Sequence, residues 1–253
     1  MSKRLLISVL SLVIFLYSSG VFAADTEADF QKANQLFQDK EYVEAIALYR
    51  DILADGVESA PLYFNLGNAY FKDGDLGRAI LYYLKARRLD PSDNDIAANL
   101  EFARQFTSIQ MEGVKLNPIS TFFESVVGPY RLNTLAWLSS LLFILFFSLL
   151  SLRYGFGFRN SSLRVGTTVV LILLVVSSWM TSFKYRHDYL TQRAVIVADE
   201  CPVHSGPYEQ SDIELEAAPG LVVELLTESG EYYNVLFDNK RRGWIKKNLV
   251  AAI

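Results

Sequence analysis

Residues 60–91, APLYFNLGNAYFKDGDLGRAILYYLKARRLDP, are the part of the sequence that decides the fold. Gly74 lies in the middle of this stretch and Pro91 at its end. Glycine commonly ends a helix and proline cannot continue one, so two helices are expected, one on each side of Gly74. Gly67 and Ala79 are small, which lets the two helices cross at close range.

This segment resembles the tetratricopeptide repeat, a helix–turn–helix unit that recurs about every 34 residues. Eight residues match the repeat pattern at its offsets: Tyr63, Leu66, Gly67, Tyr70, Ala79, Tyr83, Ala86 and Pro91. A weaker copy precedes it by one repeat period, with Ala33, Ala45 and Tyr49 in place of Gly67, Ala79 and Tyr83. The sequence therefore predicts an all-α repeat domain over 26–106, with repeats at 26–59 and 60–93 and a capping helix at 93–106.

Two repeats and a cap are fewer than the three repeats that a stable stack usually needs. We therefore expect this domain to be marginal alone, or to pack on a partner or on a copy of itself.

The resemblance implies a peptide-binding groove lined by the first helix of each repeat. The candidate groove residues are Asn34, Phe64, Asn65, Asn68, Phe71, Lys72 and Asn99. Asparagine amides both donate and accept hydrogen bonds, so they could hold a ligand backbone. The same asparagines could instead stabilise the repeats, and the sequence leaves both roles open.

The N-terminus has the layout of a signal peptide over 1–23. Lys3 and Arg4 precede an apolar run, and Val21-Phe22-Ala23 places suitable residues before a cut after Ala23. An uncleaved anchor is the alternative. Both versions export the residues that follow.

Two uncharged runs, 132–152 and 165–183, are each long enough to cross a bilayer and predict a two-helix transmembrane hairpin. The connecting loop, 153–164, holds three arginines and no acid, which marks it as cytoplasmic. Export of the N-terminal domain then places both soluble domains on the outer side. Residues 107–131 form a linker, within which 118–130 are predicted to be either an interfacial helix or plain connecting chain.

Residues 194–253 contain short β-rich runs separated by turn residues, which predicts a small all-β barrel. This segment resembles the bacterial SH3-like domain in Val203-His204-Ser205-Gly206-Pro207 and in Gly243-Trp244-Ile245. The resemblance implies binding of peptides or cell-wall components. Candidate surface residues are Tyr208, Tyr232, Tyr233 and Trp244, although Tyr233 and Trp244 are favoured as core residues.

No catalytic set, cofactor motif or metal site is apparent. The two histidines and the single cysteine, Cys201, do not have a standard metal-ligand spacing, and no intramolecular disulfide can form. Net charge is −4 with no basic stripe, which argues against nucleic-acid binding. The sequence therefore predicts a multidomain binding protein rather than an enzyme.

The order of these parts resembles the BatE-type tetratricopeptide-repeat proteins of the Bacteroides aerotolerance (Bat) group. That resemblance implies work beside membrane-bound von Willebrand A-domain proteins and a MoxR-type ATPase, in stress tolerance or envelope assembly. The prediction is a two-pass scaffold in a bacterial inner membrane, with both soluble domains in the periplasm. The alternative is a peptidoglycan sensor acting through the SH3-like domain. A third version is the subunit of an envelope enzyme whose activity lies in a partner. The oligomeric state is open.

Overall fold

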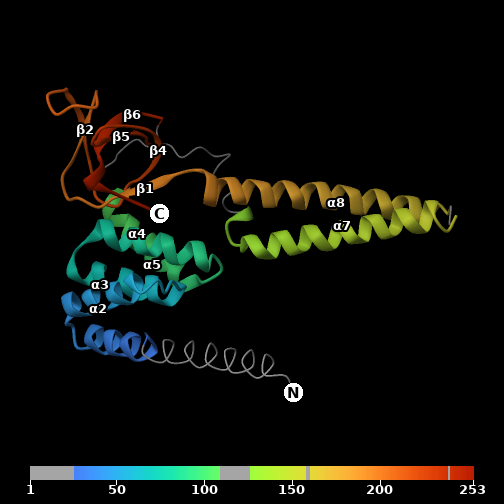
Figure 1. Ribbon diagram of the computed structural model, residues 1–253, viewed down its shortest axis with the longest axis horizontal. Coiled ribbons are helices and arrows are strands. Elements are labelled where there is room, and N and C mark those ends of the chain that lie inside the picture. Colours follow the sequence, from blue (N-terminus) through green and yellow to red (C-terminus); the bar gives the residue numbers. More distant parts are fainter. Residues whose placement is uncertain (1–25, 109–125, 158–159, 239) are drawn as a thin grey trace, which may run out of the picture.

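The structure is a computed structural model that describes residues 26–108, 126–157, 160–238 and 240–253. The predicted signal peptide, 1–23, and residues 109–125 of the predicted linker lie outside the described residues. The described chain consists of a helical repeat domain, a long helical hairpin and a β domain (Figure 1).

The repeat domain is built from antiparallel helix pairs. Its helices are residues 26–38, α2 (Tyr42–Ala54), α3 (Ala60–Asp73), α4 (Leu76–Leu89) and α5 (Asn94–Ser108). Side chains and glycine fix the helix ends. The Ser59 hydroxyl accepts a hydrogen bond from the Leu62 amide, and Asp75 accepts one from the Arg78 amide. Gly74 ends α3 with a φ of +94°, a left-handed conformation that glycine adopts without strain.

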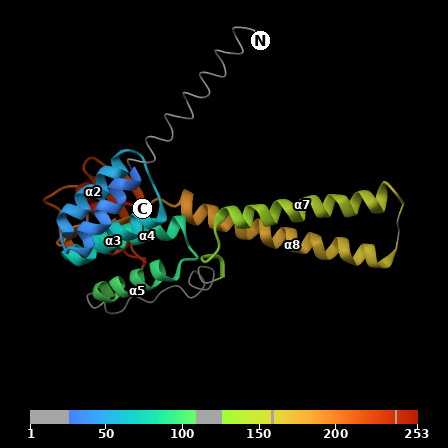
Figure 2. The same cartoon turned by 90° about the horizontal axis from the view of Figure 1, so that it is seen from below.

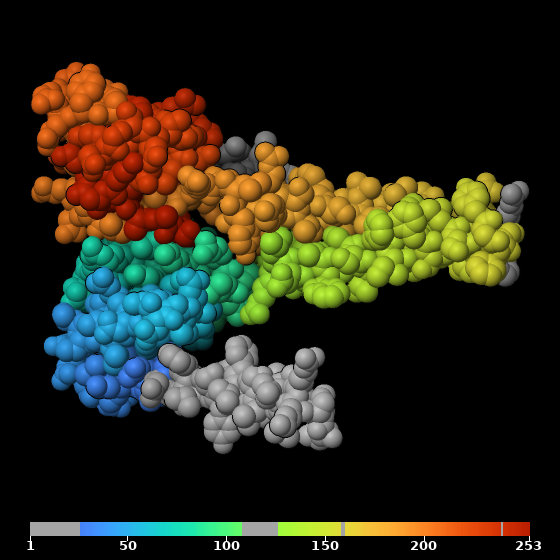
Figure 3. Space-filling view, viewed as in Figure 1, coloured from blue at the N-terminus to red at the C-terminus, as the bar shows by residue number. Residues whose placement is uncertain are grey.

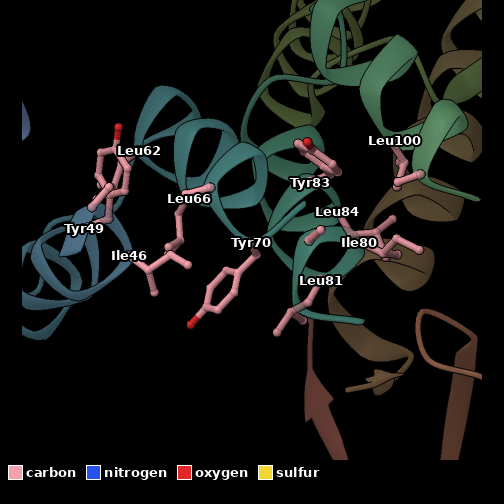
Figure 4. Close-up of a cluster of buried hydrophobic side chains, with 14 of the residues drawn as sticks. Ile46, Tyr49, Leu62, Leu66, Tyr70, Ile80, Leu81, Tyr83, Leu84 and Leu100 are labelled. Carbon is pink, nitrogen blue, oxygen red and sulfur yellow. The ribbon is translucent and has the colours of Figure 1, made fainter. Parts of the chain in front are cut away.

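Large aromatic and aliphatic side chains fill the space between these helices (Figure 4). Tyr49 and Tyr83 occupy equivalent places in the two repeats and are almost fully buried. A methyl group at Gly67 would lie 2.8 Å from the Tyr83 ring, so the ring occupies the space that a side chain would need. The predicted close crossing at Gly67 is therefore confirmed.

The hairpin consists of α7 (Leu132–Tyr154) and α8 (Ser161–Tyr185), which lie side by side. By length and composition, both helices could cross a membrane. Few residues of either helix are buried against the rest of the described chain. Ser139 of α7 lies 3.2 Å from Ser177 and 3.1 Å from Thr181 of α8, which links the helices near one end. A single π-helical turn, Arg186–Leu190, continues α8 into the β domain.

The β domain is one antiparallel sheet in the order β3-β2-β6-β5-β4-β1-β7. Its strands are β1 (Arg193–Ile196), β2 (Cys201–His204), β3 (Ile213–Ala217), β4 (Val222–Ser229), β5 (Tyr232–Leu236), β6 (Arg242–Lys246) and β7 (Val250–Ala252). Buried residues of β1 to β6 reach one common core, so the sheet must bend around it.

The barrel that was predicted is not closed, which corrects that part of the expected fold. Strands β3 and β7 are the two edges of the sheet and do not pair with each other. The reason lies in β7, which pairs with β1 on one side while Ala251 and the following Ile253 pack against the repeat domain. The edge that would close a barrel is thus directed towards α4.

The β domain covers the end of the repeat stack. Val195, at the centre of this contact, is fully buried and belongs to the same hydrophobic cluster as Ile80 and Leu84. A methyl group at Gly77 would lie 2.7 Å from Val197 Cα, so the backbones of α4 and of the chain after β1 touch. The partner that the short stack was expected to need is therefore supplied in part by the chain itself.

Polar contacts join the two domains around this apolar centre. The Thr107 hydroxyl donates to the Pro219 carbonyl at 3.2 Å, and Arg88 Nη1 donates to the main-chain oxygen of Ile253 at 2.9 Å. The surfaces meet without a visible gap in Figure 3. Figures 1 and 2 both show the hairpin projecting away from the two domains, which lie together at one of its ends. Two crossings of a bilayer by this hairpin would leave both domains on one side.

Candidate functional site

The first helix (residues 26–38), α3 and α5 form a continuous surface along the repeat domain. Asn65 of α3 donates to Asn34 of the first helix at 2.8 Å. The Phe71 ring of α3 lies 5.6 Å from that of Phe102 and 5.8 Å from that of Phe106, both on α5. We call this surface the repeat face, defined by Asn34, Asn65, Asn68, Phe71, Phe102 and Phe106.

Two asparagines of the repeat face bind tyrosines of their own repeats. The Tyr49 hydroxyl donates to Asn34 Oδ1 and the Tyr83 hydroxyl donates to Asn68 Oδ1, each at 2.7 Å. In both bonds the two residues are 15 positions apart along the chain, so each repeat contains the same hydrogen bond between its two helices. The Asn34 oxygen also accepts from Asn65, so its two lone pairs are both used. This geometry favours a structural role for Asn34.

Burial keeps the hydroxyls of Tyr49 and Tyr83 protonated, which their hydrogen bonds to the two asparagines require. It raises the pKa of Tyr49 to about 12 and also raises that of Tyr83. Both phenols are therefore neutral hydrogen-bond donors at physiological pH. The asparagine oxygens are thereby held in fixed orientations on the repeat face.

Asn65 and Asn68 retain hydrogen-bonding capacity. Within the described residues, Asn65 Oδ1 and Asn68 Nδ2 make no hydrogen bond. They lie three positions apart on α3, which places an acceptor and a donor on one side of the helix. An amide of a bound peptide could use both. This part of the repeat face is the portion of the asparagine set that could bind a ligand.

Three phenylalanines form an aromatic cluster beside these amides. Phe102 and Phe106 meet nearly edge to face, with ring centroids 5.4 Å apart and an interplanar angle of 80°. Phe102 is 50% exposed and Phe106 is 49% exposed, whereas Phe71 is half-buried. Two exposed rings held in fixed contact form an apolar patch of the kind that marks interaction sites.

The remaining predicted groove residues lie in different surroundings. Phe64 packs on the core, 5.9 Å from the Tyr83 ring, and is only partly accessible. Lys72 is exposed and lies next to Phe71 in the chain. Asn99 donates to the Asp95 carbonyl of its own helix at 2.8 Å, so its amide nitrogen is engaged locally.

Phe102 and Phe106 are absent from the sequence-based candidates. The repeat pattern of side chains weakens after Leu100, so the sequence predicts no groove residue in the capping helix other than Asn99. The repeat period carries the missing signal, because Phe102 and Phe106 lie one period after Asn68 and Lys72.

The candidate aromatic residues of the β domain separate into exposed and buried positions. Tyr208 is 57% exposed. Tyr233 and Trp244 are half-buried, and Lys247 Nζ lies 5.1 Å from the centre of the Tyr233 ring. Tyr232 is buried against His204, and its hydroxyl has no hydrogen-bond partner within the described residues. The four side chains therefore do not form one open stacking surface.

Cys201 lies in the core of the β domain and is fully buried. Burial raises the pKa of its thiol to about 12, so the residue behaves as a small apolar side chain. Within the described residues, no three His, Cys, Asp or Glu side chains gather in a way that could hold a metal ion.

The tetratricopeptide repeat family model matches residues 60–93, the stronger of the two repeats in the sequence. The crystal structure of the yeast Tom70 is similar at 18% identity, over 74% of this chain and 31% of that chain, with a TM-score of 0.31. That TM-score is too low for the likeness to carry an argument. No curated protein matches the chain. Tetratricopeptide repeats are typically non-enzymatic interaction scaffolds, so the family match supports a role in binding proteins.

Proposed function

We propose that this protein is a membrane-anchored adaptor that binds a protein partner through its repeat face. The observation that carries the proposal is the aromatic cluster of Phe71, Phe102 and Phe106, whose two outer rings are half-exposed on a rigid helical support. A pair of exposed phenylalanines is costly on a surface that meets only water. Such rings are suited to act as anchors for an apolar side chain of a partner.

The repeat face fits a partner helix or extended peptide with apolar side chains along one edge. Its apolar residues would rest on Phe102 and Phe106, while Asn65 Oδ1 and Asn68 Nδ2 would bind a polar group beside them. Lys72 is exposed at the same end of α3 and would favour an acidic residue in the partner. This arrangement uses helix-in-groove recognition, in which apolar anchors give affinity and polar groups fix the register.

The hairpin of α7 and α8 anchors this adaptor in the bacterial inner membrane under the proposal. An N-terminal export signal would place the repeat domain and the β domain in the periplasm. The support is the apolar length of both helices and the presence of both domains at one end of the hairpin. The partners would then be envelope proteins. On the resemblance to the Bat group, they would include von Willebrand A-domain proteins of a stress-tolerance or assembly complex.

A photo-crosslinking amino acid at Phe102 tests the repeat face in the full chain in membranes. We expect covalent capture of a discrete protein partner at this position. The matched control is the same amino acid at Val43, an exposed apolar residue of α2 that is 62% exposed. Equal capture at both positions, or none at Phe102, would contradict the proposal.

Reporter fusions test the topology separately. A reporter that is active only in the periplasm should give signal after Ile253 and none within the 155–162 loop. The opposite pattern would place both domains in the cytoplasm. The repeat face would still bind proteins in that case, but its partners would be cytoplasmic.

A wall-binding role of the β domain is a second candidate, favoured by the exposed ring of Tyr208. Aromatic faces stack on sugar rings, and Tyr208 packs over Gly206, where a methyl group would lie 2.8 Å from the ring. Sedimentation of the full chain in detergent with purified peptidoglycan tests this role. Binding that survives Tyr208→Ala unchanged would exclude this ring as the contact.

A further inference from the structure

The loop end of the α7–α8 hairpin carries two arginines and two exposed aromatic rings. We call it the hairpin tip and define it by Arg153 and Tyr154 in the last turn of α7, Phe156 in the loop and Arg164 in the first turn of α8. Tyr154 is 66% exposed and Phe156 is 73% exposed, and Arg164 is also exposed. Figures 1 and 2 show this end of the hairpin projecting away from the repeat domain and the β domain. The surface is therefore open to whatever surrounds the hairpin.

No acidic side chain balances the two arginines of the hairpin tip. The sequence has no Asp or Glu from residue 125 to residue 187, so both hairpin helices and their loop are free of acids. Every acid of the described residues lies in the repeat domain, the β domain or the turn that joins α8 to β1, at the opposite end of the hairpin. Among the described residues, Arg153 and Arg164 form no ion pair. Two uncompensated cations attract anions.

The Tyr154 ring supports the guanidinium group of Arg153. The guanidinium carbon, Cζ, lies 5.1 Å from the centre of the ring. An arginine that packs on an aromatic ring keeps its charge and the N–H donors in its plane. The ring thus helps to hold the guanidinium group in place without using its donors. Phosphate is a suitable partner for such a group, because two of its oxygens can accept from one guanidinium together.

The spacing of cations along each helix matches the thickness of a bilayer. Arg131 precedes α7 and Arg153 lies near its other end, and the helical rise of about 1.5 Å per residue places them ~33 Å apart along the axis. Arg164 and Lys184 of α8 are ~30 Å apart by the same rise. The hydrocarbon core of a bilayer is about 30 Å thick. With the domain end of the hairpin at one face of the membrane, the hairpin tip therefore lies at the phosphates of the opposite leaflet.

The two aromatic rings favour a lipid over an acidic protein as the partner of these arginines. Tyrosine is enriched where a membrane protein meets the headgroup region, and Tyr154 lies at that depth. An acidic segment of a soluble protein would leave the exposed Phe156 ring largely in water. At the boundary between headgroups and acyl chains, the same ring is covered by lipid. Cations next to membrane helices attract anionic headgroups at this depth.

We infer that the hairpin tip binds the phosphate groups of anionic phospholipids through Arg153 and Arg164. This inference rests on the proposed membrane anchoring. It holds for either orientation of the hairpin, because the tip reaches the leaflet opposite the two domains in both. The bound lipids fix the depth of the tip in that leaflet. The repeat domain and the β domain are thereby held at a set height above the other leaflet.

Fluorescence quenching at the hairpin tip tests the inference in the full chain reconstituted into vesicles. Phe156→Trp supplies a local reporter, and subtraction of the parent protein's emission removes the signal of the three native tryptophans. The vesicles contain phosphatidylglycerol and phosphatidylcholine in equal amounts, with bromine on the acyl chains of one lipid at a time. We expect brominated phosphatidylglycerol to quench the reporter more strongly than brominated phosphatidylcholine.

Replacement of the two arginines in the reporter protein measures their share of this preference. Each arginine should raise the preference for phosphatidylglycerol about fivefold, which corresponds to about 1 kcal/mol. Arg153→Gln/Arg164→Gln should therefore remove most of the difference in quenching between the two lipids. Arg153→Lys/Arg164→Lys keeps the charge and should retain most of it.

The matched control is Arg50→Gln/Arg242→Gln, because these two arginines are exposed on α2 and β6, outside the hairpin. It should leave the quenching unchanged. Equal quenching by both lipids, or an unchanged preference in Arg153→Gln/Arg164→Gln, would overturn the inference. Loss of the preference in millimolar inorganic phosphate would assign the arginines to soluble phosphate. Absence of the preference together with photo-crosslinking of a protein from position 156 would assign them to an acidic protein, and both results would overturn the lipid assignment.

Alkaline carbonate extraction of membranes separates this inference from the membrane anchoring on which it rests. A chain that stays in the membrane pellet but shows no lipid preference at the hairpin tip retains its anchoring and lacks only the lipid site. A chain released by carbonate lacks the anchoring itself, and the inference then fails with it.

Discussion

Replacement of Gly77 by alanine tests the contact between the repeat domain and the β domain. The added methyl would lie 2.7 Å from Val197 Cα and 2.8 Å from the Ile196 carbonyl oxygen. Both are backbone atoms at the end of β1, so neither can turn aside as a flexible side chain could. The β domain must therefore shift away from α4 to admit one carbon atom.

The expected cost follows from two opposing effects. Overpacking of a tight contact typically costs about 1–3 kcal/mol, and contact with rigid backbone favours the upper end. Alanine is the better helix former by at most about 1 kcal/mol, which offsets part of this cost. The net expectation is a loss of about 2 kcal/mol. For a chain of this size, that corresponds to a fall in Tm of about 4–8 °C.

Thermal unfolding of the purified full chain in detergent, followed by circular dichroism, measures this effect. Amide hydrogen exchange should also quicken at Val197, whose N–H donates to the Leu249 carbonyl at 2.9 Å. The matched control is Gly166→Ala in α8, where a methyl group would meet nothing within 4 Å. If Gly77→Ala were as stable as the parent protein, the β domain would not pack on α4 as described.

Other predictions concern single side chains and are measurable on the same preparation. Cys201, whose pKa burial raises to about 12, should react with iodoacetamide at pH 8 only as fast as the β domain unfolds; rapid labelling of the native protein would contradict its burial. Tyr83→Phe should cost about 1 kcal/mol in urea unfolding by removing the bond to Asn68, and a cycle with Asn68→Ala should show coupling. The raised pKa of Tyr49, about 12, means that an unfolded chain loses this proton near pH 10 while the folded chain keeps it. The free energy of unfolding should therefore fall between about pH 10 and 12, with a shallower fall in Tyr49→Phe. Phe102→Ala should change Tm little, because the ring is half-exposed, yet should reduce partner capture; a loss of stability without loss of capture would assign the ring to folding alone.

The repeat could be predicted because its signals are local. Gly67 and Tyr83 lie within a single repeat, and the repeat period places each small and large residue without knowledge of the rest of the fold. Phe102 and Phe106 do not stand out in the sequence for the same reason, since α5 departs from the repeat pattern at its other positions. Their importance appears only where Phe71 meets them across two helices.

The contact between the domains could not be predicted. In the sequence, Gly77 is an ordinary residue near a helix start and Gly220 an ordinary turn residue. A methyl group at Gly220 would collide with Ile80 Cδ1, so this glycine also permits a close contact across the domains. The two residues of each such contact lie far apart along the chain, so no periodic pattern in the sequence reveals the contact. Strand β7, at the open edge of the sheet, takes part in the same contact, because Ala251 packs against the repeat domain.

The docking of β1 on α4 also affects the order in which the chain can fold during synthesis. Leu89 ends α4 and Arg193 begins β1, so the whole hairpin is translated between them. At a synthesis rate of about 5–20 residues per second, β1 is completed roughly 5–20 s after α4. The apolar end of the repeat stack remains uncovered during that time. During that interval Ile80 and Leu84 are open to chaperones or to a neighbouring chain. Under the proposed membrane anchoring, insertion of the hairpin would become a checkpoint in biogenesis, because a chain stalled at that step keeps an exposed apolar surface that quality-control proteins can recognise.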